Sequence, residues 1–281
     1  ALYKYLAPCR AAQILRDLRI RFSQVSVLND VDEFLPPYKG FATREKAEEV
    51  AREFLPFKYP EEYAEVYRNL PKDQADQLIN EKVREGADNL EESFQEGKIG
   101  RDLYAKLDCN FGMLSLSATL TSKLMWSFYS DGGRGIVIEF DTSHAWFNNK
   151  TAYNGSFRRL RKVLYVADRE PTYFLSAKDN EVLYTKTLEW EFEDEWRIIR
   201  GFNGGQKAPK QDPYGKDVFL FDIPPFAIQT VVFGYRTTSE NEKALRKIVI
   251  ANENLKHIVF RRAVRNVDGK IEIVSDGIGI L

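Results

Sequence analysis

The first thirty residues switch between two hydrophobic periods. Residues 1–5 alternate apolar and polar side chains, as a half-buried strand does. Apolar side chains then recur at helical spacing over residues 10–18, and residues 19–23 alternate again before the turn formers at 28–30. This pattern predicts a strand, a helix and a second strand.

A charged, helix-favouring segment runs from Thr43 to about Lys106. Glu, Lys, Arg, Ala and Gln dominate it and prolines at 56, 60 and 71 divide it, which predicts several amphipathic helices. We interpret it as a helical insertion of about residues 43–107 within a single α+β domain of residues 1–281. We expect it to pack over a sheet as a lid or flank, because charged helical faces are usually solvated; binding of a partner protein is the alternative.

The remaining two thirds of the chain are rich in predicted strands. Residues 110–117 alternate, residues 122–129 predict a helix with large apolar side chains, and residues 136–141 have the pattern of a buried strand. Further strands are predicted at residues 161–166, 195–200, 218–223, 228–233, 257–263 and 270–274, with a helix at 239–251 and a loop at 201–215. The fold class is therefore α+β.

Composition limits the chemistry more than the fold. The 41 Lys and Arg nearly cancel the 42 Asp and Glu, so contact with nucleic acid would need a local basic patch. Two distant cysteines and two histidines provide no disulfide framework, zinc motif or histidine triad. The sequence contains no apolar stretch of about 20 residues and no pattern of a signal peptide. We therefore expect a cytoplasmic protein without membrane contact. Carboxylates, hydroxyls and aromatics must carry any catalysis.

The densest chemical signal is the acid-rich segment from Trp190 to Arg197. In a strand, Glu193, Glu195 and Arg197 would share one face, and the repelling acids would need cations such as Arg197 or Lys186. A solvated edge strand with a salt-bridge ladder is the ordinary interpretation. The two flanking tryptophans favour instead a packed site with apolar walls, where the pKa of a carboxylate can shift.

Two other patterns in the sequence are weaker signals. Glu139 and Asp141 could ligate magnesium together with Glu193 and Glu195, as in a metal-dependent nuclease, but such pairs more often end strands facing water. We therefore expect no metal site. The run of glycines around Arg134 lacks a Walker lysine and predicts a turn rather than a phosphate loop.

Several short elements together resemble one bacterial family. They are Leu2-Tyr3-Lys4-Tyr5, Arg21-Phe22-Ser23, Leu28-Asn29-Asp30, Ser115-Leu116-Ser117, Leu124 to Tyr129, Gly135 to Asp141, Lys186, Trp190 to Arg197 and Phe233-Gly234. The pairing of the Met-Trp-Ser element with the Trp-x-aromatic-Glu-x-Glu-Trp-Arg element is the specific part. The chain is identified as a member of the family catalogued as domain of unknown function 2971, over nearly its whole length except the helical insertion.

More distantly, the order of elements is similar to the ADP-ribosyltransferase fold of poly-ADP-ribose polymerases and bacterial ADP-ribosylating toxins. That resemblance implies a split, twisted sheet with a helical insertion, and NAD as the substrate. It also implies a polar residue on the first strand, a hydroxyl on the strand before a helix, an aromatic on that helix and a glutamate on a late strand.

The resemblance implies roles for particular residues. Glu195 would stabilise the oxocarbenium-like state and hold the ribose 2′-hydroxyl, and Glu193 would activate the acceptor. Ser115 or Ser117 would bond the nicotinamide amide, Tyr129 would stack on its ring, and Arg21 or Lys4 would meet the diphosphate. The remaining residues of the implied NAD site are Tyr5, Trp126 and Arg197.

The sequence thus predicts an NAD-binding ADP-ribosyltransferase or an NAD-hydrolysing enzyme, of the kind that serves as a bacterial toxin or antiviral defence effector. The acceptor, protein or nucleic acid, stays open at this stage. A noncatalytic ligand- or partner-binding module is the first alternative, and a metal-dependent nuclease the second.

Overall fold

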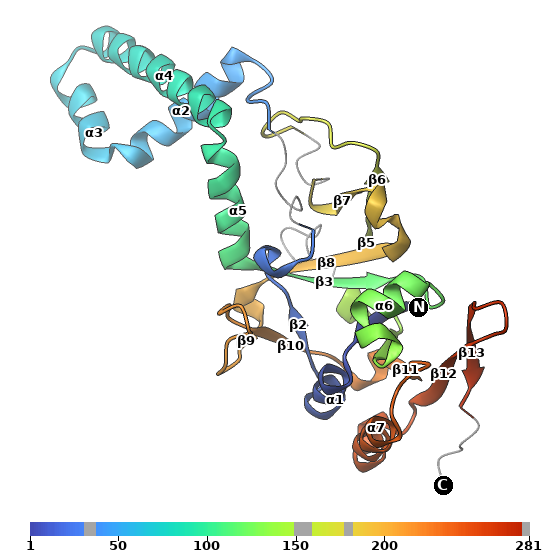
Figure 1. Cartoon of the computed structure of the whole chain (residues 1–281). Coiled ribbons are helices and arrows are strands. Elements are labelled where there is room, and N and C mark those ends of the chain that lie inside the picture. The colour runs from blue at the N-terminus through green and yellow to red at the C-terminus, as the bar shows by residue number, and fades with distance from the viewer. Residues whose placement is uncertain (31–37, 149–158, 177–181, 277–281) are drawn as a thin grey trace. The chain divides into compact units, whose positions relative to one another are not determined.

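A computed structural model of the chain describes residues 1–30, 38–148, 159–176 and 182–276, and its chain forms two compact units (Figure 1). We call residues 1–29, 107–167 and 184–281 the sheet unit, and residues 30–106 and 168–183 the helical unit. The large sheet and the helices beside it confirm the predicted α+β class. In the described part of the chain, no helix is long and apolar enough to cross a membrane.

An eight-stranded sheet is the centre of the sheet unit. Its strands lie in the order β13 (Ile271–Ser275), β12 (Val259–Arg265), β11 (Ile228–Phe233), β4 (Ile136–Phe140), β1 (Leu2–Leu6), β3 (Phe111–Ser117), β8 (Glu195–Gly201) and β5 (Arg161–Lys162). Neighbours pair antiparallel except β11 and β12, which are parallel. Helix α7 (Ser239–Ala251) supplies the crossover that a parallel pair requires.

The sheet opens between its two central strands. β1 and β3 share one register pair, Tyr3 with Ser117, whereas β1 pairs with β4 over its whole length and β3 pairs with β8 over seven positions. Beyond that pair the ammonium of Lys4 donates to the carbonyl of Ser115 at 2.8 Å, where a ladder bond would otherwise lie. We call this opening the β1–β3 split.

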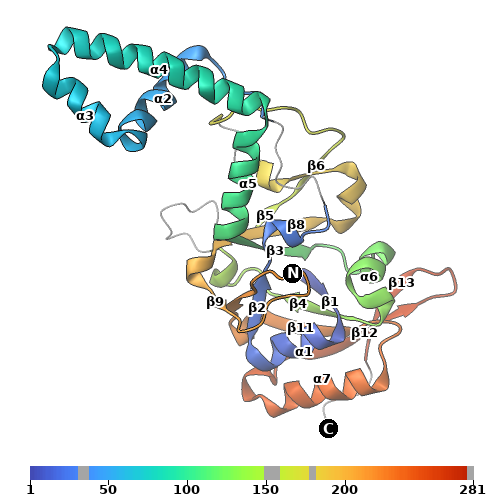
Figure 2. The same ribbon diagram turned by 60° about the vertical axis from the view of Figure 1, so that its left-hand side comes forward.

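The two faces of the sheet have separate cores. Helices α1 (Pro8–Asp17) and α7 lie side by side over one face and bury the larger core against it (Figures 1 and 2). Helix α6 (Lys123–Tyr129) covers the other face, where Met125 and Trp126 pack on Tyr5, Val137 and Val232. The hydroxyl of Ser122 caps α6 by accepting from the amide of Met125.

Smaller strands complete the sheet unit. β2 (Arg19–Phe22), β10 (Phe219–Asp222) and β9 (Gln206–Lys207) form a three-stranded sheet, which a bridge from Ser23 to Met113 joins to β3. The strand predicted at residues 161–166 is wrong as one element. The chain leaves β5 at Val163, and β6 (Leu164–Val166) pairs instead with β7 (Thr185–Thr187).

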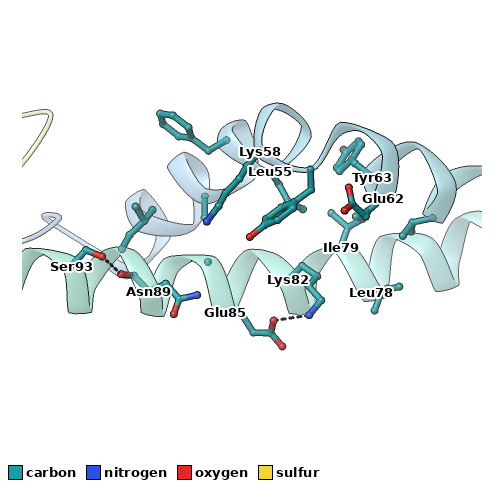
Figure 3. Close-up of a pocket in the computed structure, with 16 residues that line it drawn as sticks. Leu55, Lys58, Glu62, Tyr63, Leu78, Ile79, Lys82, Glu85, Asn89 and Ser93 are labelled. Carbon is teal, nitrogen blue, oxygen red and sulfur yellow. Dashed lines mark hydrogen bonds and ion pairs between the residues drawn. The ribbon is translucent and has the colours of Figure 1, made fainter. Parts of the chain in front are cut away.

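The helical unit holds α2 (Arg44–Lys58), α3 (Pro60–Asn69), α4 (Lys72–Gln95) and the first part of α5 (Lys98–Asn110), which confirms helices over the predicted insertion. α2 packs on α4 through small and branched side chains, among them Ala47, Val50, Ile79 and Val83. An apolar groove of about 530 Å³ lies between α2, α3 and α4. Lys82 and Glu85, both on α4, form an ion pair at its edge (Figure 3). That the helical insertion packs over a sheet as a lid or flank, or instead binds a partner protein, stays a prediction.

Substituting Gly135 with Ala should destabilise the sheet unit. A Cβ there would lie 2.3 Å from the carbonyl oxygen of Leu6 and 2.7 Å from Cα of Ser130, and backbone atoms cannot move aside cheaply. We expect the free energy of unfolding to fall by about 1–3 kcal/mol in urea denaturation. Gly100→Ala is the control, because its Cβ meets open space in α5 and should stabilise by about 0.5–1 kcal/mol. Equal stability of the two variants would refute this packing.

Candidate functional site: a buried pair of carboxylates

The acid-rich segment is a 3₁₀ turn followed by a strand. The turn η5 covers Leu188–Glu193, Asp194 has a left-handed φ of 40°, and β8 begins at Glu195. The expectation that one continuous strand aligns Glu193 with Glu195 was therefore wrong. The turn at Asp194 nevertheless directs both carboxylates inward, since Glu193 is 5% and Glu195 3% exposed.

Glu195 is held by three donors. The Nε and terminal nitrogen of Arg197 each donate to it at 2.8 Å, and the hydroxyl of Ser115 on β3 donates as well. Burial alone would raise the pKa of Glu195. The charges of Arg197 and Lys186, together with these hydrogen bonds, outweigh burial and hold the pKa well below its usual range. Glu195 is therefore an ionised carboxylate at neutral pH.

Glu193 lies beside it and takes its partners from other elements. One carboxylate oxygen accepts from the hydroxyl of Tyr129 at the end of α6, and the other accepts from the ammonium of Lys186 at 2.7 Å. The backbone carbonyl of Glu193 accepts from the hydroxyl of Ser117 at 2.6 Å. Strand β3, helix α6 and the turn η5 thus converge on this residue.

Lys186, on the short strand β7, joins the two acids. Its ammonium lies 2.7 Å from Glu193 and 3.0 Å from Glu195, and 5.1 Å from the centre of the Trp190 ring. The side chain is 3% exposed, so all three charges are withdrawn from water together. Lys186 was expected as a counter-charge to the acids but not as a residue of the site. Mutual repulsion of the acids was the signal that could have placed it there.

Two tyrosines line the carboxylates. Burial, and then the negative charge of Glu193, raise the pKa of Tyr129, so its hydroxyl keeps its proton and donates a hydrogen bond to Glu193. Asn29 donates in turn to the Tyr129 oxygen. Tyr165 on β6 accepts from the amide of Glu195 at 2.8 Å, and burial raises its pKa. Tyr165 had no sequence signal, and Asn29 belongs to an element of the family resemblance to which no role in the site was given.

Lys4 reaches the same region through the β1–β3 split. Burial lowers the pKa of Lys4 to about 8, against the opposing attraction of Glu195 and Glu193. The first strand thus provides a cation whose charge changes close to neutral pH. Among the residues predicted for the site, Lys4, Ser115, Ser117, Tyr129, Glu193, Glu195 and Arg197 are brought together.

Three predicted residues lie elsewhere. Arg21 on β2 pairs with Asp212 at 2.7 Å, so the structure gives that guanidinium another partner. Trp126 is fully buried and donates to the carbonyl of Leu120, while the hydroxyl of Tyr5 donates to the carbonyl of Thr119. Tyr5 and Trp126 meet edge to face at 5.2 Å and form the core beneath α6. Tyr5 and Trp126 therefore belong to the hydrophobic core on which α6 packs, and not to the group of polar side chains around the two acids.

The two acidic pairs do not meet. Glu139 on β4 is separated from Glu195 on β8 by β1 and β3, and Asp141 accepts from the amide and hydroxyl of Ser143. Within the described residues, no group of three His, Cys, Asp or Glu side chains could hold a metal ion. The glycines before β4 form the predicted turn, with positive φ at Gly132 and Gly133.

Comparison with known proteins identifies one family. The model described as "Protein of unknown function (DUF2971)" matches residues 125–198, a range that includes both the Met-Trp-Ser element and the acid-rich segment. No curated protein and no solved structure matches the chain.

Replacing Lys186 with Met should strongly destabilise the protein, because it leaves two buried carboxylates without their shared cation. We expect a loss of about 3–5 kcal/mol in the free energy of unfolding, measured with urea. The control is Lys162→Met, which removes an exposed pair with Asp194 at 3.0 Å and should change stability by less than about 1 kcal/mol. A loss at Lys186 no larger than that at Lys162 would contradict the buried network.

Glu195 should make stability sensitive to acid. Its folded-state pKa lies below the unfolded value of 4.5, so the unfolded chain binds the extra proton and stability declines as the pH falls below about 4.5. Urea denaturation between pH 3 and pH 7 should show this decline. In Glu195→Gln the slope should be shallower by up to about 1.4 kcal/mol per pH unit. Parallel slopes in both proteins would mean that Glu195 does not titrate as described.

Proposed function

We propose that this chain, which belongs to the family of proteins of unknown function DUF2971, binds NAD and breaks the bond between nicotinamide and ribose. The ADP-ribose would pass to an acceptor or to water. The observation that carries the proposal is the convergence of Glu193 and Glu195 with Ser115, Tyr129 and Lys4 beside the β1–β3 split. Such an activity would suit a bacterial toxin or an antiviral defence effector.

Glu195 has the properties that the bond-breaking step needs. Departure of nicotinamide with the bonding electron pair leaves positive charge on the ribose, and a fixed carboxylate stabilises charge that develops in the transition state. The low pKa of Glu195 keeps it ionised, and Arg197 with Ser115 fixes its orientation. The role of Ser115 is thus to position Glu195, instead of bonding the nicotinamide amide.

Glu193 suits the second half of the reaction. It would take the proton that the acceptor loses as the new bond to the ribose forms, while Tyr129 and Lys186 hold its carboxylate in place. Ser117 supports this arrangement through the backbone of Glu193. Lys4 would meet the diphosphate, since Arg21 is engaged with Asp212.

One observation favours a noncatalytic alternative. Two buried carboxylates meet two buried cations, Lys186 and Arg197, and such a balanced set also serves purely to fix a fold. In that case the surface around it would bind a ligand or partner without chemistry. A substitution that keeps the shape of the side chain and removes its charge, such as Glu195→Gln, distinguishes the catalytic function from the noncatalytic one.

Nicotinamide release from NAD by the purified protein, followed by chromatography, tests the proposal. Glu195→Gln should lower the rate by about 100- to 1000-fold, the usual loss when one transition-state contact is removed. Glu191→Gln is the control, because Glu191 lies on the same turn but is exposed and should leave the rate unchanged. If the unmodified protein releases no nicotinamide and NAD does not raise its melting temperature, the proposal is wrong.

A further inference from the structure

A ladder of aromatic rings leads away from the carboxylate pair. Phe128 on α6 lies 5.9 Å from Phe192, and Phe192 lies 6.1 Å from Trp190, measured between ring centres. Phe128 and Phe192 are the direct chain neighbours of Tyr129 and Glu193, whose side chains bond each other. We call these three rings the aromatic ladder.

The ladder begins at the edge of the core beneath α6, against which Phe192 packs, and extends to the surface. Phe128 is 67% exposed, and Phe192 and Trp190 are half-buried, whereas Trp126 on the same helix is fully buried. Leu124, one turn before Phe128, is 46% exposed. Large rings kept at the surface beside a polar site mark a place where a flat, apolar group binds.

Charge is divided unequally between the two units. The residues of the sheet unit include 27 Lys and Arg against 19 Asp and Glu, a net charge of +8, while the helical unit has 14 against 23, a net charge of −9. The overall net charge of −1 hides this difference. The sheet unit, which carries the ladder, therefore attracts polyanions.

Some of these cations share the face of the ladder. Along β12, Arg261 and Arg265 alternate with Ala263, which packs under α6, so both guanidinium groups lie on the α6 side of the sheet and both residues are exposed. The side-chain nitrogens of Lys123, at the start of α6, and of Arg265 both lie close to Gly269. The face that carries the aromatic ladder thus also carries exposed basic residues.

We propose that the aromatic ladder binds a single-stranded nucleic acid, whose bases stack on its rings while Arg261, Arg265 and Lys123 meet its phosphates. Exposed rings on a sheet face that also carries exposed basic residues are a combination that suits single strands, and duplex bases are unavailable because they already stack on each other. A peptide would account for the apolar rings but not for the net charge of +8.

The inference deepens the proposed function and, as far as it names the acceptor, rests on it. A nitrogen of the stacked base forms the new bond to ribose C1′ as nicotinamide leaves with the electrons of the broken bond. The proton displaced from that nitrogen passes to Glu193, whose carboxylate adjoins the ladder.

Binding is tested without NAD, by fluorescence anisotropy of labelled single-stranded DNA and RNA of one sequence with the full chain. Phe128→Ala should weaken binding by about 5-fold or more, as loss of one base-aromatic stack does. Phe226→Ala is the matched control, since Phe226 is 65% exposed on the same unit but lies beside His257, away from the ladder, and should change binding less than 2-fold.

The phosphate contacts have their own test. Replacing Arg261 and Arg265 together with Gln should weaken binding and reduce the slope of its logarithmic salt dependence by about 1.4. Replacing Lys243 and Lys247 on α7, which covers the opposite face, should do neither. Equal slopes in the two double variants would overturn the assigned face.

Labelled NAD then separates this inference from the proposed function. Label transferred to the oligonucleotide by the unmodified protein, and not by Phe128→Ala, supports both. Nicotinamide release with no oligonucleotide binding, or with label in protein alone, overturns the inference and leaves the NAD activity standing. Oligonucleotide binding that depends on Phe128, with NAD left intact, supports the nucleic-acid surface and overturns the NAD activity.

Discussion

The compensation of two buried carboxylates by one lysine and one arginine is the interaction on which the rest of the site depends. Withdrawing Glu193 and Glu195 from water is strongly unfavourable unless cations and hydrogen bonds replace the lost solvation. Lys186 touches both acids, and Arg197 clamps the second with two bonds of 2.8 Å. Three elements, the strand β7, the turn η5 and the strand β8, must therefore be in place before the acids can be buried at all.

The same requirement explains why the sheet opens where it does. β3 presents Ser115 and Ser117 to the acid segment, and β1 leaves β3 after the pair of Tyr3 with Ser117. The ammonium of Lys4 then takes the place of a ladder donor at the carbonyl of Ser115. Strand divergence would otherwise leave backbone groups unpaired, so the cation at the split stabilises the opening that the site needs.

Local patterns predicted most of the elements, because alternation and helical spacing report burial within one segment. Strands β4, β8 and β11 and helices α6 and α7 lie where that reasoning put them. That reasoning failed where the conformation of a single residue sets the direction of the chain. Asp194, in a left-handed conformation, ends the turn before β8, and the chain leaves β5 at Val163 to begin β6. Asn29 and Tyr165 could not be found, since their contacts join residues 100 and 30 positions apart.

Residue types predicted that Glu193, Glu195 and Arg197 come together, which they do, but not which side chains surround them, and α6 shows why. Trp126 and Phe128 stand two residues apart on one short helix, so they face different directions, and composition cannot say which of them meets the core. Trp126 does, and Phe128 faces water beside the acids.

The cations that surround Glu195 also constrain its chemistry. The cations that allow Glu195 to be buried also weaken its attraction for a positive charge that develops nearby. In the proposed reaction Glu195 would therefore stabilise the ribose less than an unpaired carboxylate would, in exchange for a folded, ionised side chain.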